Sequence, residues 1–522
     1  MTRTLHRILF AFALSIFSLQ ALGQTETTYP LYAVAAGKPP YTPEDMQIIA
    51  KNFHYMRGRA DQSVIEKIHQ INPDFRFIEY YSTGTFGLTA TAKDTEKLYR
   101  QEIAMFGVGK LASAINASQT TFRLQPEVEG NSISLKKSTT TADFTIDIQN
   151  YVTWVRIDNE FMKITDFDAA TGKISVIRGF SGTAAASHDL NAMVFSPIYI
   201  GASYPGGTDH KKRIRYAVDI TSQIARKLII DHTYDAVTKK HYDGLWLDTF
   251  NARSFNHKDM FGKNVELVWD FNKKEYSTKE IKRTKQEIRL NYAQNQLRDK
   301  LGEWPFFLAN RMGPDQYWPG KGDTRRMLLP TDLKPRPLDG YCIESFAGEL
   351  YSPNQKPHYR KGKVWRSHVM MLMDATQRGL AALPRASNGG PQSLYLVPAG
   401  PIRDDFENYA YASFLMAVER DSKIMLGIPA YYYYEETKTR KAWVHPRYYL
   451  PIGAPIEKRQ PADIDQYIPA GHVTYMRRFT NGLVLVNPND KDDLIKLDDY
   501  YFDPDIGKMI NSINMRSLSG KI

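Results

Sequence analysis

The sequence predicts an α/β protein: a (β/α)8 TIM barrel with an inserted antiparallel β module and a small C-terminal β domain. Eight short apolar segments begin near residues 29, 53, 75, 242, 305, 339, 379 and 423, and helical patterns separate most of them. That number of strands, alternating with helices, is typical of this barrel. From about 118 to 196 the chain alternates apolar and polar residues between turn signals, and from about 472 two apolar runs flank Asn481-Gly482, a strong hairpin signal.

With 522 residues, the chain is long enough to bury a large core and to divide into several units. We expect barrel strands one to three in residues 24–117, the inserted module in 118–196, strands four to eight in 197–455 and the C-terminal domain in 456–522. Hydrophobic residues at 42% and charged residues at 24% are ordinary for a globular protein.

Residues 1–23 have the pattern of a secretory signal peptide. Arg3 and Arg7 form a basic start, residues 9–19 form an apolar core, and Ala21-Leu22-Gly23 supplies small residues before a cleavage site. The core is too short for a membrane span, which needs about 20 residues, and no cysteine follows it to carry a lipid. We therefore expect a secreted or periplasmic protein without a membrane span.

Charge and cysteine content exclude several classes of protein. The formal charge is +11, but the basic residues are scattered, and we expect no nucleic-acid partner because such binding needs a basic cluster on one face. An acidic polysaccharide or a negatively charged cell surface would suit this charge. The only cysteine is Cys342, so no internal disulfide can form, and its place in an apolar segment predicts a buried structural side chain.

The first barrel elements follow one another closely. A strand over 29–37 leads to a helix that Thr42 caps and Pro43 begins, and a second strand covers 53–58. Asp61 is predicted to cap a helix that runs to Ile71 and stops at Asn72-Pro73, and the third strand covers 75–81.

The inserted module should contain antiparallel strands. The alternating segments that predict them are residues 144–148, 155–158, 161–164 and 173–177. His188 follows them, but no second histidine lies at metal-ligand spacing, so a structural role is predicted.

The barrel pattern resumes at Pro197. A helix capped by Thr221 or Ser222 should reach about residue 233, and a charged helix should cover 273–301. The remaining elements are strands at 242–248, 305–310, 339–344, 379–385 and 423–428, with helices at 364–378 and 404–418.

Two strands carry the same acidic pattern. Asp243-Gly244 precedes Asp248, and Asp339-Gly340 precedes Glu344, with the same offset from Asp-Gly to the final acid. As the ends of the fourth and sixth strands, Asp248 and Glu344 should lie at the C-terminal face, where enzymes with this fold work. Carboxyl groups roughly 5–10 Å apart suit glycosidic-bond hydrolysis by the retaining or the inverting route. We favour Asp248 as nucleophile or base and Glu344 as acid; the reverse, and plain capping or ion-pair roles, stay open.

Other strand-end residues are candidate substrate ligands. Hydrogen bonds to sugar could come from Arg57, Glu79, Asn310 and Arg385, although ion pairing is the structural alternative for the charged members. Aromatic platforms could come from Trp246 and Tyr431, although alternation must turn half of the Tyr431–Tyr434 run toward the core. The sequence contains no phosphate-binding loop, metal-ligand cluster or Ser/His/Asp signature, so we predict no cofactor.

The chain resembles the putative glycosyl-hydrolase-like family 15 of secreted barrel proteins. The resemblance rests on residues 242–248 and 339–344, on Gly453-Ala454-Pro455, and on residues 477–488. Within the insert, residues 155–160 and 177–184 are similar to a β unit of phage-tail and adhesin-like proteins. The family resemblance implies hydrolysis of glycosidic bonds in a polysaccharide or oligosaccharide. The main alternative is a non-catalytic carbohydrate-binding or surface-adhesion protein, with a polysaccharide lyase third.

Overall fold

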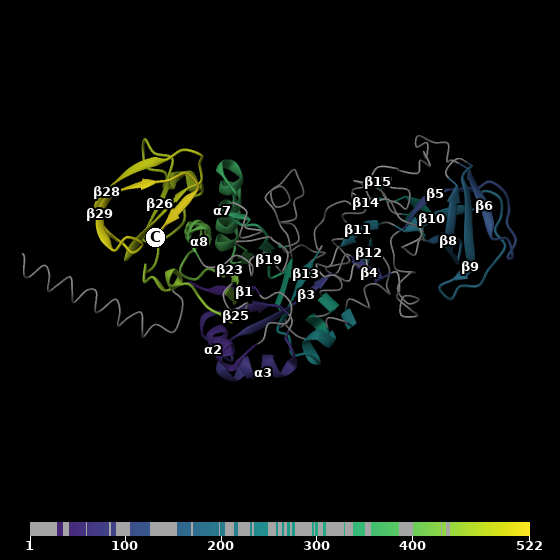
Figure 1. The fold of residues 1–522 in the computed structure, drawn as a ribbon, viewed down its shortest axis with the longest axis horizontal. Helices are drawn as coiled ribbons and strands as arrows, with labels where there is room; N and C mark the ends of the chain where they lie inside the picture. The colour runs from purple at the N-terminus through teal and green to yellow at the C-terminus, as the bar shows by residue number, and fades with distance from the viewer. Residues whose placement is uncertain are drawn as a thin grey trace, which may run out of the picture.

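The computed structural model describes three recognisable parts along one axis: the β module at one end, the barrel in the middle and the C-terminal β domain beside helices α7 and α8 (Figure 1). The described residues are 29–34, 41–58, 60–82, 85–89, 105–125, 154–168, 171–197, 199–203, 213–217, 230–231, 234–248, 257–258, 264–265, 269–271, 274–276, 295–296, 298–300, 306–309, 328, 338–349, 357–385, 400–429, 431–434 and 439–522. The predicted signal peptide lies outside them.

Eight parallel strands form the barrel, and all eight predicted strands are confirmed. Two isolated parallel bridges, Ala382 to Ile424 and Arg385 to Gly427, join the seventh strand to the eighth and complete the ring. In chain order the strands are β1 (Leu31–Val34), β2 (Tyr55–Arg57), β3 (Arg76–Ser82), β13 (Gly244–Asp248), β18 (Phe306–Ala309), β19 (Gly340–Ile343), β22 (Ala381–Pro384) and β23 (Leu426–Pro429).

Side chains alternate between the inside and the outside of this ring, as a pleated strand requires. The interior is filled by one apolar cluster whose fully or mostly buried members are Tyr32, Val34, Ile78, Trp246, Leu308, Cys342, Ala381 and Leu383. The strand residues between them, such as Ala33, Phe77 and Tyr341, belong to the larger core that packs under the helices. This alternation decides which strand-end residues can face the barrel mouth.

Two glycines let neighbouring strands approach. A Cβ atom on Gly427 would lie 2.2 Å from Tyr32 Cζ, and one on Gly340 would lie 1.9 Å from the Ala381 carbonyl oxygen. The space at Gly427 admits the Tyr32 ring to the barrel interior, where its hydroxyl lies 3.3 Å from the Leu383 carbonyl.

The predicted helices around the barrel are largely confirmed. The described helices with printed bounds are α2 (Pro43–Asn52), α3 (Gln62–Ile71), α7 (Gly362–Gln377) and α8 (Pro401–Leu415). Thr42 and Asp45 form the capping box that begins α2, whereas Asp61 precedes α3 without a side-chain cap. The predicted helix over 273–301 begins too early, because β17 (Glu275–Tyr276) pairs with β16 (Trp269–Asp270).

The segment after Pro197 also differs from the prediction of barrel elements. It forms β11 (Tyr199–Ser203) and β12 (Arg213–Ala217), which join an antiparallel five-stranded sheet with β4 (Thr85–Thr89), β14 (His257–Lys258) and β15 (Asn264–Val265). Pairing of β12 with β4 places this segment in an antiparallel sheet outside the parallel barrel. This sheet lies between the barrel and the module (Figure 1).

The module is a closed antiparallel barrel of six strands. Three predicted strands are confirmed within it, and the segment 144–148 lies outside the described residues. Its strands are β5 (Met105–Leu111), β6 (Thr121–Gln125), β7 (Trp154–Ile157), β8 (Glu160–Asp168), β9 (Lys173–Phe180) and β10 (Met193–Pro197). Because β5 pairs with β10 to close the ring, the module begins before residue 118.

His188 is a buried structural residue of the module, as predicted. Its Nδ1 lies 2.8 Å from Asp158 and its Nε2 lies 2.9 Å from Glu160. Glu160 also accepts hydrogen bonds from Arg178 and from the Gly179 and Ala186 backbones. Burial opposes ionisation of Glu160, but these hydrogen bonds outweigh it and lower its pKa to about 2.

The C-terminal domain combines a three-stranded sheet with a two-stranded ribbon. Its strands are β26 (Tyr475–Phe479), β27 (Gly482–Asn487), β28 (Asp493–Asp503), β29 (Lys508–Met515) and β30 (Ser519–Lys521). The predicted hairpin is confirmed, but Phe479 pairs with Gly482, so Thr480 and Asn481 are the turn residues. Gly482 instead begins β27, and a Cβ atom there would lie 3.3 Å from Ile452.

Buried side chains attach this domain to the barrel helices. The Trp365 ring of α7 lies 4.6 Å from the Tyr475 ring, and Arg477 donates a 2.6 Å hydrogen bond to the Leu415 carbonyl of α8. None of the helices in the described parts of the chain is both long and apolar enough to cross a membrane.

Candidate active site

The C-terminal ends of the parallel strands gather charged residues at one rim of the barrel. Arg57 ends β2, Glu344 directly follows β19, and Arg385 directly follows β22. Each stands two residues after a side chain of the interior cluster, namely Tyr55, Cys342 and Leu383. Alternation therefore turns all three toward the mouth.

The Arg57 guanidinium lies over two aromatic rings. Its Cζ is 4.3 Å from the centre of the Tyr80 ring and 4.8 Å from the centre of the Trp246 ring. Such stacking attracts a cation to the ring faces and fixes the plane of the guanidinium. Tyr80 is not among the residues predicted from the sequence, although its position two residues after the interior Ile78 could have indicated it.

The pKa of the Cys342 thiol, which lies below the barrel mouth, shows which charged groups act there. Burial raises the pKa of its thiol strongly and the charge of Glu344 raises it further, while Arg57, Arg385 and a hydrogen bond with Tyr32 oppose the shift. The Glu344 carboxylate and both guanidinium groups are therefore close enough to act on one buried sulfur. The thiol stays protonated at neutral pH, which confirms the predicted structural role of Cys342 and argues against a nucleophile.

Backbone hydrogen bonds fix Glu344 next to Arg385. The Arg385 N–H donates to the Ile343 carbonyl at 2.8 Å, and the Phe346 N–H donates to the Arg385 carbonyl at 2.8 Å. Ser345 and Ala347, which follow Glu344, have φ values of 61° and 60°. Non-glycine residues rarely adopt this left-handed conformation, and the strain is the kind found beside functional groups.

The other predicted catalytic acid, Asp248, ends β13 as expected. Its backbone pairs with Ser82 on β3, and its side chain lies outside the described part of the structure. Asn310 follows β18 and is likewise outside the described residues. The separation of the two carboxyl groups accordingly stays a prediction.

Three predicted substrate ligands lie away from the open mouth. Glu79 alternates outward, and its Oε1 lies 3.3 Å from Lys240 Nζ, which is the ion-pair alternative weighed above. Trp246 has no exposed surface and supports Arg57 from within the barrel. Tyr431 is also fully buried, in the core under the helices and 6.3 Å from the Tyr41 ring, so it offers no face to a sugar. These positions correct the expectation of direct sugar contacts.

The acids that open the two Asp-Gly segments lie at the opposite, N-terminal end of the barrel. Asp243 accepts a 2.7 Å hydrogen bond from the Phe77 N–H and lies 3.2 Å from His69 Nε2. Asp339 pairs with Arg298 at 2.9 Å. Polar groups at this end of such barrels serve stability, and these partners fit that role.

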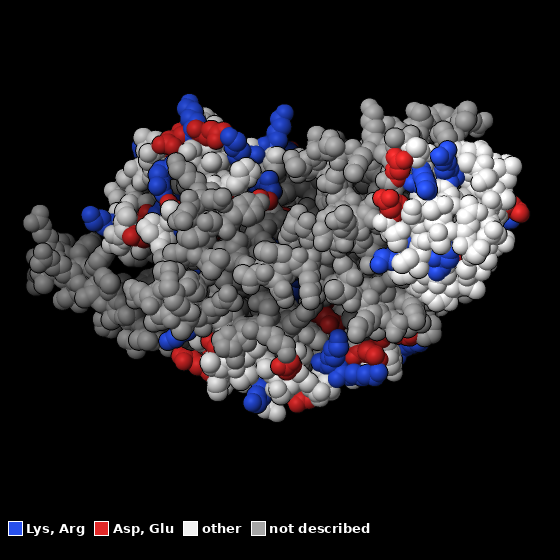
Figure 2. Space-filling view, turned by 45° about the vertical axis from the view of Figure 1, so that its right-hand side comes forward, with Lys and Arg blue, Asp and Glu red and all other residues white. Residues whose placement is uncertain are grey.

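Charge is mixed over the visible surface. Figure 2 shows lysine and arginine side chains interspersed with aspartate and glutamate on the described parts of this face, and a broad, largely uncharged face on the module at the right. The described surface on this face therefore shows no large field of one sign that would select a ligand by charge.

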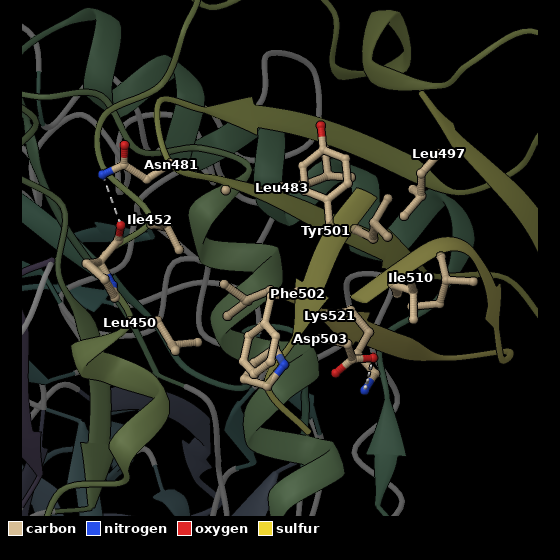
Figure 3. Close-up of a pocket in the computed structure, with 16 residues that line it drawn as sticks. Leu450, Ile452, Asn481, Leu483, Leu497, Tyr501, Phe502, Asp503, Ile510 and Lys521 are labelled. Carbon is tan, nitrogen blue, oxygen red and sulfur yellow. Dashed lines mark hydrogen bonds and ion pairs between the residues drawn. The ribbon is translucent and has the colours of Figure 1, made fainter. Parts of the chain in front are cut away.

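A separate pocket of about 430 Å³ lies in the C-terminal domain, where residues 450–452 meet the open end of the two small sheets. Figure 3 shows the rings of Tyr501 and Phe502 at this pocket, the ion pair of Asp503 with Lys521 at one side and Asn481 at another. The remaining lining is mainly leucine and isoleucine. Its size and its few polar groups are those of a small-molecule site.

The described residues contain no group of three histidine, cysteine, aspartate or glutamate side chains arranged to hold a metal ion. The charged groups at the mouth, the Glu344 carboxyl and the guanidinium groups of Arg57 and Arg385, suit acid–base chemistry and binding of polar substrates.

Comparison with protein-family models gives no match, and comparison with curated proteins gives none. Several solved structures are similar at low identity. The glycoside hydrolase domain of PelA from Pseudomonas aeruginosa is 12% identical, with a TM-score of 0.35, over 77% of this chain and 95% of its own. Amy13B of Eubacterium rectale is 8% identical, with a TM-score of 0.42, over 95% of each chain. The maltogenic alpha-amylase AmyB of Thermotoga neapolitana is 8% identical, with a TM-score of 0.33, over 95% of this chain and 96% of its own.

These neighbours are glycoside hydrolases, but their TM-scores are too low to support an argument. The strand pairing alone defines this chain as a (β/α)8-barrel protein with added β modules. The charged rim at the C-terminal ends of its strands defines the candidate site.

Proposed function

We propose that the protein is a secreted glycoside hydrolase that cleaves a polysaccharide with two carboxyl groups, Asp248 and Glu344. The observation that carries the proposal is that both acids end barrel strands at the same rim, with the same offset from Asp-Gly. The resemblance to the glycosyl-hydrolase-like family 15 supports the same reaction, and the signal-like residues 1–23 support export.

In this proposal Glu344 donates its proton to the glycosidic oxygen as the bond to the anomeric carbon breaks. Asp248 stabilises the positive charge that develops on the sugar, and it either attacks the anomeric carbon or activates a water molecule. The first route retains the configuration and needs carboxyl groups about 5–5.5 Å apart, whereas the second inverts it and needs about 6.5–9.5 Å. Arg57 and Arg385 would orient the sugar beside the acid.

The test is a screen of the purified protein on a panel of polysaccharides, with release of reducing ends as the readout. The protein should cleave at least one polymer, and a Glu344→Gln variant with an unchanged circular-dichroism spectrum should not. Equal activity of the variant and the natural protein would remove Glu344 from the mechanism. The configuration of the first product, followed by NMR, distinguishes the two routes.

A second candidate function is carbohydrate binding without cleavage. The pocket in the C-terminal domain favours it, because the exposed Phe502 and the neighbouring Tyr501 offer ring faces beside the polar Asp503 and Asn481. Binding of a polysaccharide that the protein does not cleave, weakened by Phe502→Ala and unaffected by Glu344→Gln, would support this function over hydrolysis.

A further inference from the structure

We infer that the barrel mouth binds a sugar unit that carries an anionic group, a uronate carboxylate or a sulfate ester, and that Arg57 recognises the charge. The inference rests on the proposed function, since it names the substrate class for the same site. It starts from the way the structure holds this arginine.

The stacking on Tyr80 and Trp246 prepares Arg57 to receive a ligand. The guanidinium carbon lies over the two rings at 4.3 and 4.8 Å, and contact with ring faces leaves the N–H donors of a guanidinium available at its edge. A guanidinium edge matches the oxygens of a carboxylate or sulfate with two parallel hydrogen bonds. Trp246, one of the two rings, is fully buried and held by the barrel interior, so Arg57 loses less rotational freedom on binding.

Arg57 differs in its partners from five other half-buried or buried arginines. Among the side chains that the structure describes, no carboxylate lies within ion-pair distance of the Arg57 guanidinium, whose contacts are the two rings. Five comparable arginines each have a carboxylate oxygen at 2.6–2.9 Å: Arg178 with Glu160, Arg298 with Asp339, Arg360 with Glu349, Arg403 with Glu407 and Arg477 with Glu457.

A partly desolvated cation gains most from an anion. For the five paired arginines, the anion is a carboxylate of the protein itself. For Arg57 at the barrel mouth, a substrate can provide the anion.

A second cation strengthens the field at the same place. Arg385 follows β22, which only β23 and β1 separate from β2 in the ring. It is only 7% exposed, and its charge acts on Cys342 in the same direction as that of Arg57. The charges of Arg57, Arg385 and Glu344 all act on the same buried thiol. Arg385 therefore adds to the attraction that a negatively charged sugar would meet next to the bond that Glu344 protonates.

The experiment compares polymers that differ only in charge. A uronate-containing polysaccharide is tested beside its carboxyl-reduced form, and a sulfated polymer beside its desulfated form. The natural protein should cleave the anionic member of one pair with a kcat/KM roughly 100-fold higher than the neutral member, the scale expected for one charged hydrogen-bonded pair. Which pair shows the preference identifies the anionic group.

Arg57→Gln should raise KM for the anionic polymer by about tenfold or more and change kcat less, and it should lower kcat/KM for the neutral member by a clearly smaller factor. Arg57→Lys keeps the charge but loses the bidentate donor. Its KM for the anionic polymer should therefore lie between those of the natural protein and Arg57→Gln. The matched control is Arg378→Gln on α7, an exposed arginine paired with Asp374, which should alter neither polymer. Thermal unfolding of each variant shows that the barrel is intact.

The outcomes separate this inference from the proposed function. Equal cleavage of the anionic and neutral members, or an Arg57→Gln variant that loses both equally, overturns the anionic class and leaves the hydrolase intact. If no polymer is cleaved, calorimetric titration of the natural protein and Arg57→Gln with uronate and sulfated oligosaccharides decides the inference by itself. Binding that depends on Arg57 and weakens with salt supports it, and absence of binding to both overturns it.

Discussion

The two ends of the fourth and sixth barrel strands place acidic side chains in different surroundings. At the N-terminal end, the carboxylates of Asp243 and Asp339 lie against Phe77 N–H, His69 and Arg298. At the C-terminal end, Glu344 stands with Arg57 and Arg385 around the barrel mouth. The comparison shows that the presence of an acid in the repeated Asp-Gly segment does not by itself make that acid part of a functional site. Its end of the strand and its partners decide whether it stabilises the fold or faces a substrate.

The largest effect should follow changes at the C-terminal end. We expect Glu344→Gln and Asp248→Asn each to lower kcat by roughly 10²- to 10⁴-fold, the range for loss of a general acid or base. Glu79→Gln is the control, because Glu79 faces outward toward Lys240. Initial rates of reducing-end release measure all three. If Glu79→Gln lowered kcat as much as Glu344→Gln does, the distinction between inward-facing and outward-facing acids would be wrong.

At the N-terminal end, the effect should be on stability. Asp243→Ala leaves the buried Phe77 N–H without its acceptor, and Asp339→Ala leaves Arg298, which is 4% exposed, without its carboxylate. Each should lower the free energy of unfolding by about 1–3 kcal/mol, with unchanged kcat in the folded protein. Urea unfolding measures this.

The matched control for these two variants is Asp235→Ala, which removes an exposed i,i+4 pair with Lys239. It should cost less than about 0.5 kcal/mol. Equal losses in all three variants would show that the bottom of the barrel is not a special site of stabilisation.

The module offers a third charged cluster that sharpens the contrast, because its acid is surrounded by protein donors. The folded pKa of Glu160, about 2, lies below the roughly 4.3 of an unfolded glutamate. Its ionisation therefore stabilises the module above about pH 4.3, and this contribution is lost as the pH falls toward 2. Hydrogen exchange in peptides from 154–197 should show protection that falls over this range, and Glu160→Gln should flatten the pH dependence. If Glu160→Gln showed the same pH dependence of protection as the natural protein, ionisation of Glu160 would not be its cause.

The smallest effect should come from Cys342, which lies directly below the mouth. Its thiol is fully buried with a strongly raised pKa, so Cys342→Ser should keep the cleavage rate of the folded protein and reduce stability only slightly. The native thiol should also resist alkylation at neutral pH and react after unfolding. Rapid alkylation of the native protein with loss of activity would instead place the Cys342 thiol in the accessible active site.

Much of the barrel could be predicted because local pattern and strand order are strong signals. The eight apolar segments, the Thr42 cap and the Cys342 strand were all found this way. Short strand runs such as 75–81 carry their alternation in the sequence, so the strand ends could be placed near Arg57, Glu344 and Arg385. The predictions that missed depend on pairing across the chain: β5 belongs to the module because it pairs with β10, and β12 is a strand because it pairs with β4.

By itself, the sequence determined the order of strands and helices and the residues at the strand ends, since periodicity, caps and turn signals act over a few residues. Only the tertiary structure decided which of those residues share a surface. It turned Glu79 outward to Lys240, buried Tyr431 beneath the helices and stacked Arg57 on Tyr80 and Trp246. The physical reason is that closing eight strands into a ring fixes the register and the facing of every side chain at once, and no local pattern contains that condition.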